Sequence, residues 1–194
     1  MKSSICKTIT LGLALTTLSG TASAHTGLGA IHDFAAGFVH PWLGADHLLA
    51  MFAVGLWASV LGGRALWLLP LSFLSVMGMG AGLHFAGVAL PYAEWGVAAS
   101  VLALELAVWQ DGRTAAGWAG AMSGGFALFH GYVHAAELGA NADAGLYTAG
   151  FLLATALLHG LGLATGLAGR RFGWARRAFG VFCAGVGAYL LVNV

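Results

Sequence analysis

After Ala24 the chain consists of six long apolar stretches separated by short polar breaks, and this pattern restricts it to a helical membrane protein. The stretches cover residues 42–62, 66–89, 94–110, 115–137, 145–168 and 174–193. Most are close to the roughly 20 residues that a membrane-spanning helix needs. Charged residues make up only 8% of the chain, against about 25% in soluble domains. We therefore predict an all-α membrane protein in which residues 25–194 form a single domain of six transmembrane helices.

The N-terminal segment has the three parts of a secretory signal peptide. Two lysines supply positive charge, residues 9–18 are apolar, and residues 22–24 form an A-x-A cleavage site. An apolar segment of about ten residues is too short to span a bilayer. We expect residues 1–24 to be a cleaved signal peptide, so that the mature chain begins at His25 on the outer side of a bacterial inner membrane.

The arginines predict the orientation of the six helices. If the mature N-terminus is outside, the cytoplasmic loops hold every arginine of the chain: Arg64, Arg113, Arg170, Arg171, Arg176 and Arg177. The outer loops, around Tyr92 and Asn141, hold neither lysine nor arginine. Because positive charge stays on the cytoplasmic side, we expect a multi-pass protein with both mature termini in the periplasm. The net charge of +1 and the lack of a long basic run exclude a nucleic-acid partner. The oligomeric state stays open.

Ionisable residues stand out in this apolar chain. We take as candidate metal ligands His25, His32, His40, Asp46, His47, His84, His130, His134 and Glu137. Ionisable groups in or beside lipid are costly and mark functional sites by default. Imidazole mixed with carboxylate is a ligand set that divalent transition metals prefer. The sequence therefore predicts that the protein handles a divalent metal ion near its outer side.

His130, His134 and Glu137 have the spacing i, i+4, i+7, which puts them on one stripe of a helix. Two histidines four residues apart can hold one metal ion. The H-E-x-x-H motif of zinc peptidases, with its glutamate base, is absent. The alternative is a polar stripe that only joins helices through hydrogen bonds.

A second motif runs from His40 to His47. Pro41 suits the first position of a helix, so we expect His40 at or just before the start of the first membrane helix. Asp46 and His47 are adjacent and point about 100° apart. In one interpretation, one of them binds the metal ion and the other fixes the orientation of a ligand without contacting the ion. In the other, Asp46 is only an acid at the positive end of the helix dipole.

Three further residues have two interpretations each. His84 and His159 are either ligands or core histidines with satisfied hydrogen bonds. Glu105 is either a stepping stone for a proton or cation, or a buried acid paired with a neighbouring helix.

At these motifs the chain resembles the HupE/UreJ family of nickel and cobalt permeases. The matching features are a signal peptide followed by a histidine, the segment HPWLGADHLLAM at residues 40–51, and FHGYVHAAE at residues 129–137. The family commonly has glycine after the second histidine of the last motif, where this chain has Ala135. The resemblance implies secondary uptake of Ni²⁺ or Co²⁺.

The functional hypothesis is a permease of the inner membrane with no tightly bound cofactor and no enzymatic activity. His25 and His32 would help to capture the ion. His40, Asp46 and His47 on one helix, with His130, His134 and Glu137 on another, would form the outer site. One alternative is an intramembrane zinc-dependent hydrolase that uses the same cluster. The other is a b-type haem protein.

Overall fold

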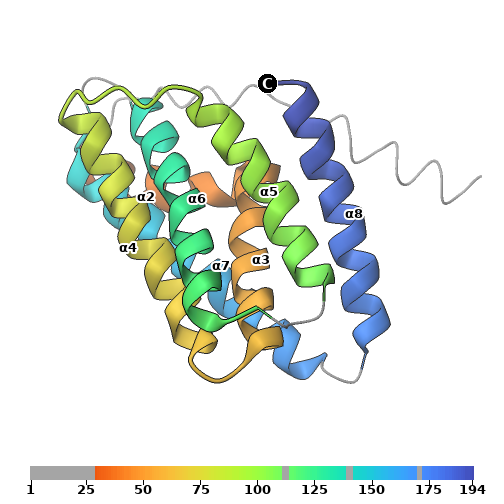
Figure 1. Cartoon of the computed structure of the whole chain (residues 1–194). Helices are drawn as coiled ribbons and strands as arrows, with labels where there is room; N and C mark the ends of the chain where they lie inside the picture. Colours follow the sequence, from red (N-terminus) through yellow and green to blue (C-terminus); the bar gives the residue numbers. More distant parts are fainter. Residues whose placement is uncertain (1–28, 111–113, 139–141, 170–171) are drawn as a thin grey trace, which may run out of the picture.

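The computed structural model describes residues 29–110, 114–138, 142–169 and 172–194. This part of the chain contains seven α-helices and no strand (Figure 1). The helices are α2 (Gly29–Leu43), α3 (Ala45–Leu61), α4 (Ala65–Phe85), α5 (Ala93–Trp109), α6 (Ala116–Ala136), α7 (Ala144–Ala168) and α8 (Gly173–Val192). The prediction of an all-α protein is confirmed. The predicted signal peptide and His25 lie outside the described residues.

Helices α3 to α8 run alternately up and down in one bundle (Figure 1). Helix α4 packs mainly on α6, α7 packs on both α2 and α3, and α8 lies at the edge of the bundle against α5. One end of the bundle holds the turn around Tyr92, the start of α7 and the end of α8, and is called the Tyr92 end. The opposite end holds the turn from Gly62 to Arg64 and the start of α8, and is called the Arg64 end.

Helices α3 and α7 touch through their backbones. A Cβ atom added at Gly55 would lie 2.0 Å from the carbonyl oxygen of His159, and one at Gly162 would lie 2.1 Å from the carbonyl oxygen of Phe52. Only glycine permits such an approach, as in the small-residue contacts of membrane helices. The contact fixes the register of α3 against α7 and brings the Met51 backbone within hydrogen-bonding distance of the His159 ring.

Each predicted apolar stretch corresponds to one helix, from α3 to α8, with ends that differ by a few residues. Two helices, α4 and α7, are each long and apolar enough to span a bilayer. Residues 33–43 of α2 and all of α3 meet at a bend of 81°. Counted together as one broken span, they give a third candidate. The 17 residues of α3 and of α5 are short for a span. The crossing of the membrane by all six helices therefore stays a prediction.

The start of the first membrane helix was predicted wrongly. Pro41 is not the first residue of a helix but lies inside α2, and His40 lies in the last turn of α2. A proline inside a helix removes a backbone N–H and crowds the carbonyl four residues earlier. Helix α2 ends two residues later, and the extended backbone of Gly44 (φ −90°, ψ 123°) precedes α3. The bend thus falls at Gly44, and α2 lies against α7.

Candidate metal centre

Three buried histidines meet near the Tyr92 end of the bundle. His47 lies in the first turn of α3, and His130 and His134 lie one helical turn apart on α6. Each is at most 4% exposed. One ligand atom of each ring lies within 4.8 Å of those of the other two. We call this set the three-histidine group.

Each of the three rings is held by one nitrogen. The Nδ1 of His47 donates to the Asp46 carboxylate at 2.7 Å, and the Nδ1 of His134 donates to the Glu137 carboxylate at 2.9 Å. The Nε2 of His130 lies 2.7 Å from the Ser100 hydroxyl oxygen. That hydroxyl gives its hydrogen to the Val97 carbonyl. It therefore accepts from the imidazole, which puts the ring hydrogen on Nε2.

The opposite nitrogen of each ring is left with its lone pair. The Nε2 of His47, the Nε2 of His134 and the Nδ1 of His130 are buried and make no hydrogen bond. Buried polar atoms without partners are rare and need an explanation. In metal sites an imidazole ligand has its other nitrogen fixed by a carboxylate or another oxygen. The three free lone pairs therefore form a ligand set that suits Ni²⁺, Co²⁺, Zn²⁺ or Cu²⁺.

A second group of ligand atoms lies beside the first, nearer the end of α6. It consists of His40 from α2, His134 and Glu137, whose ligand atoms also lie within 4.8 Å of one another. One Glu137 oxygen accepts from both His134 and the Nε2 of His40, the latter at 3.0 Å. The Glu137 side chain is 49% exposed, whereas that of His134 is 4% exposed. His134 thus links a half-open group to a buried one.

Two carboxylates neighbour these imidazoles. Asp46 is half-buried beside His47, and Glu137 caps the end of α6 beside His134 and His40. A divalent ion that leaves water for a buried site needs compensating negative charge. The two carboxylates supply this charge, and at the same time they fix the orientation of the rings.

The structure brings together most of the predicted ligands, but not all. The described residues that meet are His40, Asp46, His47, His130, His134 and Glu137. His84 belongs to neither group and instead packs its ring against Tyr132, with centroids 5.3 Å apart. His32 lies in α2, but its side chain is not described.

Sequence reasoning missed Ser100. A single serine in an apolar helix has no distinctive spacing, so no signal in the sequence separates it from a serine that bonds only to its own backbone. Its role depends on the packing of α5 against α6, which places its hydroxyl at the His130 ring.

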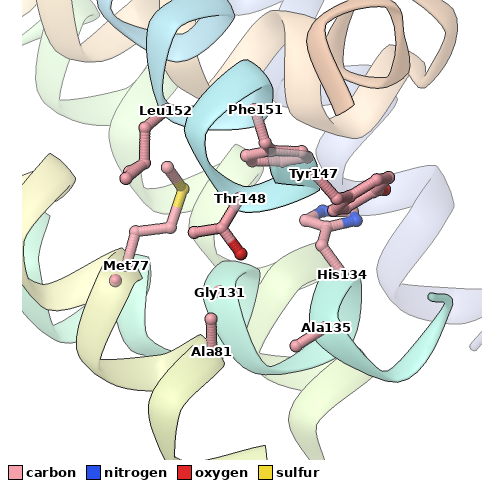
Figure 2. A pocket seen from close by; sticks show the side chains of 10 residues that line it. Met77, Ala81, Gly131, His134, Ala135, Tyr147, Thr148, Phe151 and Leu152 are labelled. Atoms are coloured by element: carbon pink, nitrogen blue, oxygen red, sulfur yellow. The ribbon is translucent and has the colours of Figure 1, made fainter. Parts of the chain in front are cut away.

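A small pocket has His134 among its lining residues (Figure 2). Its walls include Met77 and Ala81 from α4, and Tyr147, Thr148 and Phe151 from α7. The pocket has a volume of about 20 Å³, which is enough for about one water molecule. Because this lining offers a single imidazole, the pocket is not the ligand cluster itself.

The chain is similar to known proteins over nearly its whole length. A sequence model described as HupE / UreJ protein matches residues 13–190. Protein HupE of Rhizobium leguminosarum bv. viciae is 46% identical over 189 residues, which cover 95% of this chain and 97% of that protein. No solved structure matches.

Proposed function

Because the chain belongs to the HupE/UreJ family of nickel and cobalt permeases, we propose that it takes up Ni²⁺ or Co²⁺ across the bacterial inner membrane. The observation that carries the proposal is the three-histidine group, in which three buried ring nitrogens have no partner. A transporter family does not favour the alternative of a zinc-dependent hydrolase. Specificity between the two metals depends on coordination geometry, because both ions accept imidazole ligands.

The arrangement of ligands supports a passage in steps. His40 and Glu137 meet the ion first, because Glu137 is the more exposed carboxylate. His134 belongs to both groups, so it passes the ion to His47 and His130 without releasing it to lipid. Imidazole nitrogens replace hydration waters, and Asp46 and Glu137 offset the charge. A transport site must bind weakly enough for the ion to leave, and three neutral ligands meet this need better than a cage of thiolates.

The proposed topology has six spans, a cleaved signal peptide at residues 1–24 and both mature termini in the periplasm. The described arginines, Arg64, Arg176 and Arg177, all lie at the Arg64 end. The three-histidine group and Glu94 lie toward the Tyr92 end. The positive-inside rule then makes the Arg64 end cytoplasmic, and the ion reaches the site from the periplasm. His25 and His32 precede the site along the chain and would help to capture the ion.

Uptake of radioactive Ni²⁺ and Co²⁺ by a bacterial host that lacks its own nickel transporters tests the proposal. Cells that express the wild-type chain should accumulate one or both ions above vector controls. A variant with His47, His130 and His134 all changed to alanine should fall to the level of the vector at equal abundance in the membrane. Wild-type uptake equal to the vector for both metals would overturn the proposed function.

A further inference from the structure

We infer that His159 is a second, deeper binding step for the transported ion, below the three-histidine group. The inference rests on the proposed function and extends it to a residue that belongs to neither of the two ligand groups. The ligand is the same divalent transition-metal ion, held by the Nε2 atom of one imidazole.

The hydrogen bonding of His159 leaves this atom free. The Nδ1 of His159 lies 2.7 Å from the Met51 carbonyl oxygen. Because a carbonyl oxygen can only accept, Nδ1 carries the hydrogen and the neutral ring keeps its lone pair on Nε2. The side chain is 2% exposed, and Nε2 has no hydrogen-bond partner. In this ring, as in each ring of the three-histidine group, one nitrogen makes a hydrogen bond and the other makes none.

A purely structural role accounts for only half of this geometry. The Nδ1 bond joins α7 to α3, and the close contact at Gly55 already fixes that register. A structural role gives no reason for the Nε2 atom to be buried without a partner, which costs about 1–3 kcal/mol. A passing metal ion would satisfy that nitrogen.

The position of His159 continues the line of the proposed passage. Its partner Met51 lies four residues after His47 on α3, which is about 6 Å further along the helix toward the Arg64 end. The ring of Phe73 contacts both His130 and His159, with centroid distances of 5.6 and 5.1 Å. His159 therefore lies one aromatic ring away from the three-histidine group.

An open and largely apolar hollow in the surface lies nearer the Arg64 end. It has a volume of about 330 Å³ between α3, α5 and the start of α6, and Trp57, Gln110, Thr114 and Trp118 are among its lining residues. Trp57 lies six residues after Met51, or about 9 Å along α3. His159, through its partner Met51, and this hollow both lie further toward the Arg64 end than the three-histidine group does. A single imidazole with no adjoining carboxylate binds weakly, and weak binding favours onward release.

The variant His159→Asn separates the two roles of the ring. Asparagine retains an N–H near the position of Nδ1, which can still donate to the Met51 carbonyl, but it has no atom at the position of Nε2. Ni²⁺ or Co²⁺ uptake should fall by about tenfold or more, the scale of loss at altered metal sites. The matched control is Thr155→Val, which alters the same α3–α7 contact without an imidazole and should transport like the wild type.

Titration of purified protein with Co²⁺, followed by visible absorption, provides the second readout. The wild type should bind one strong and one weaker equivalent, and His159→Asn should retain the strong one and lose the weaker one. Retained strong binding also shows that the variant is folded. Normal uptake by His159→Asn, or a wild-type titration with a single equivalent, would overturn the inference. Failure of the proposed function is distinct, because it would appear as absent uptake by the wild type.

Discussion

At the scale of single residues, the distinction between ligands and the groups that orient them decides which substitutions are most informative. The free nitrogens belong to histidines, whereas Asp46, Glu137 and Ser100 each hold the opposite side of a ring. An orienting partner sets the tautomer and the basicity of its imidazole, and its loss typically costs about 10–100-fold in metal affinity. Asp46 and Ser100 can be tested without removal of any member of the two ligand groups, whereas Glu137 belongs to the second group.

Asp46→Asn preserves the shape of the side chain and removes its charge. Uptake of Ni²⁺ or Co²⁺ should fall by about tenfold or more, because His47 loses its carboxylate partner and the ion loses one of two nearby negative charges. The measurement is initial uptake at equal protein abundance. Asp143→Asn is the control, because Asp143 is an acid at the same end that caps α7, and asparagine also caps helices. Equal loss in both variants would contradict the role given to Asp46.

Ser100→Ala tests the partner that the sequence did not reveal. The Nε2–H of His130 would be left buried without an acceptor, so the ring would lose its fixed tautomer. Co²⁺ affinity of the purified protein should fall by about tenfold, and less than in His130→Ala. Ser72→Ala is the matched control, since its hydroxyl donates to the Gly120 carbonyl and contacts no histidine. An unchanged affinity in Ser100→Ala would show that the hydroxyl does not support His130.

At the scale of helices, the sequence predicted most elements but missed α2. The stretches from α3 to α8 are apolar for about 20 residues each, which is a strong signal of membrane helices. The 15 residues of α2 include His32, Asp33, His40 and Pro41, and a short segment with ionisable residues and an internal proline gives no clear signal of a helix. It is helical because it packs on α7, where a Cβ atom at Gly150 would lie 2.1 Å from the Phe34 carbonyl oxygen. Tertiary contacts outweigh the local cost of the proline.

The spacing within each motif predicted which side chains share a helix face. The expectation that the two motifs form one site came from the residue types and the family resemblance, not from periodicity. The spacing of His130 and His134 placed both on one stripe, and they do face one group. The assignment of His47 to the same group as His130 depends on the packing of α3 against α6, for which the sequence holds no periodic signal. The exclusion of His84 has the same cause, because its place on α4 puts its ring against Tyr132.

The junction between α2 and α3 makes Gly44 a sensitive position. A Cβ atom there would lie 2.8 Å from Oδ1 of Asp46 and 3.1 Å from Nδ1 of His47. These are the two atoms that form the Asp46–His47 hydrogen bond. Gly44→Ala should therefore displace the carboxylate and lower uptake by about tenfold, as loss of an orienting partner does. Gly125→Ala is the control, because a Cβ atom at that helical position meets nothing within 4 Å. Equal uptake by both variants would contradict the argument.

At the scale of the whole molecule, charge is divided between the two ends of the bundle. The described arginines lie at the Arg64 end, and the described acids other than Glu105 lie toward the Tyr92 end: Asp33, Asp46, Glu94, Glu137 and Asp143. Glu105 is buried within α5, nearer the Arg64 end. Positive residues set the orientation in a membrane, while acids contribute little to it. In the proposed function, the acids would instead attract cations toward the end where the candidate ligands gather. In the proposed function, one distribution of charge would serve both the orientation of the protein and the capture of its substrate.

The same division of charge predicts which end faces the periplasm, and single cysteines test it. In a background with Cys6 and Cys183 changed to serine, Val88→Cys near the Tyr92 end should react in whole cells with a thiol reagent that cannot cross the membrane. Gly173→Cys at the Arg64 end should react only after the membrane is permeabilised. Val88 is 48% exposed, and a Cβ atom at Gly173 meets nothing within 4 Å, so both sites tolerate a thiol. The reverse pattern would put the three-histidine group on the cytoplasmic side, where it would serve release of the ion and not its capture.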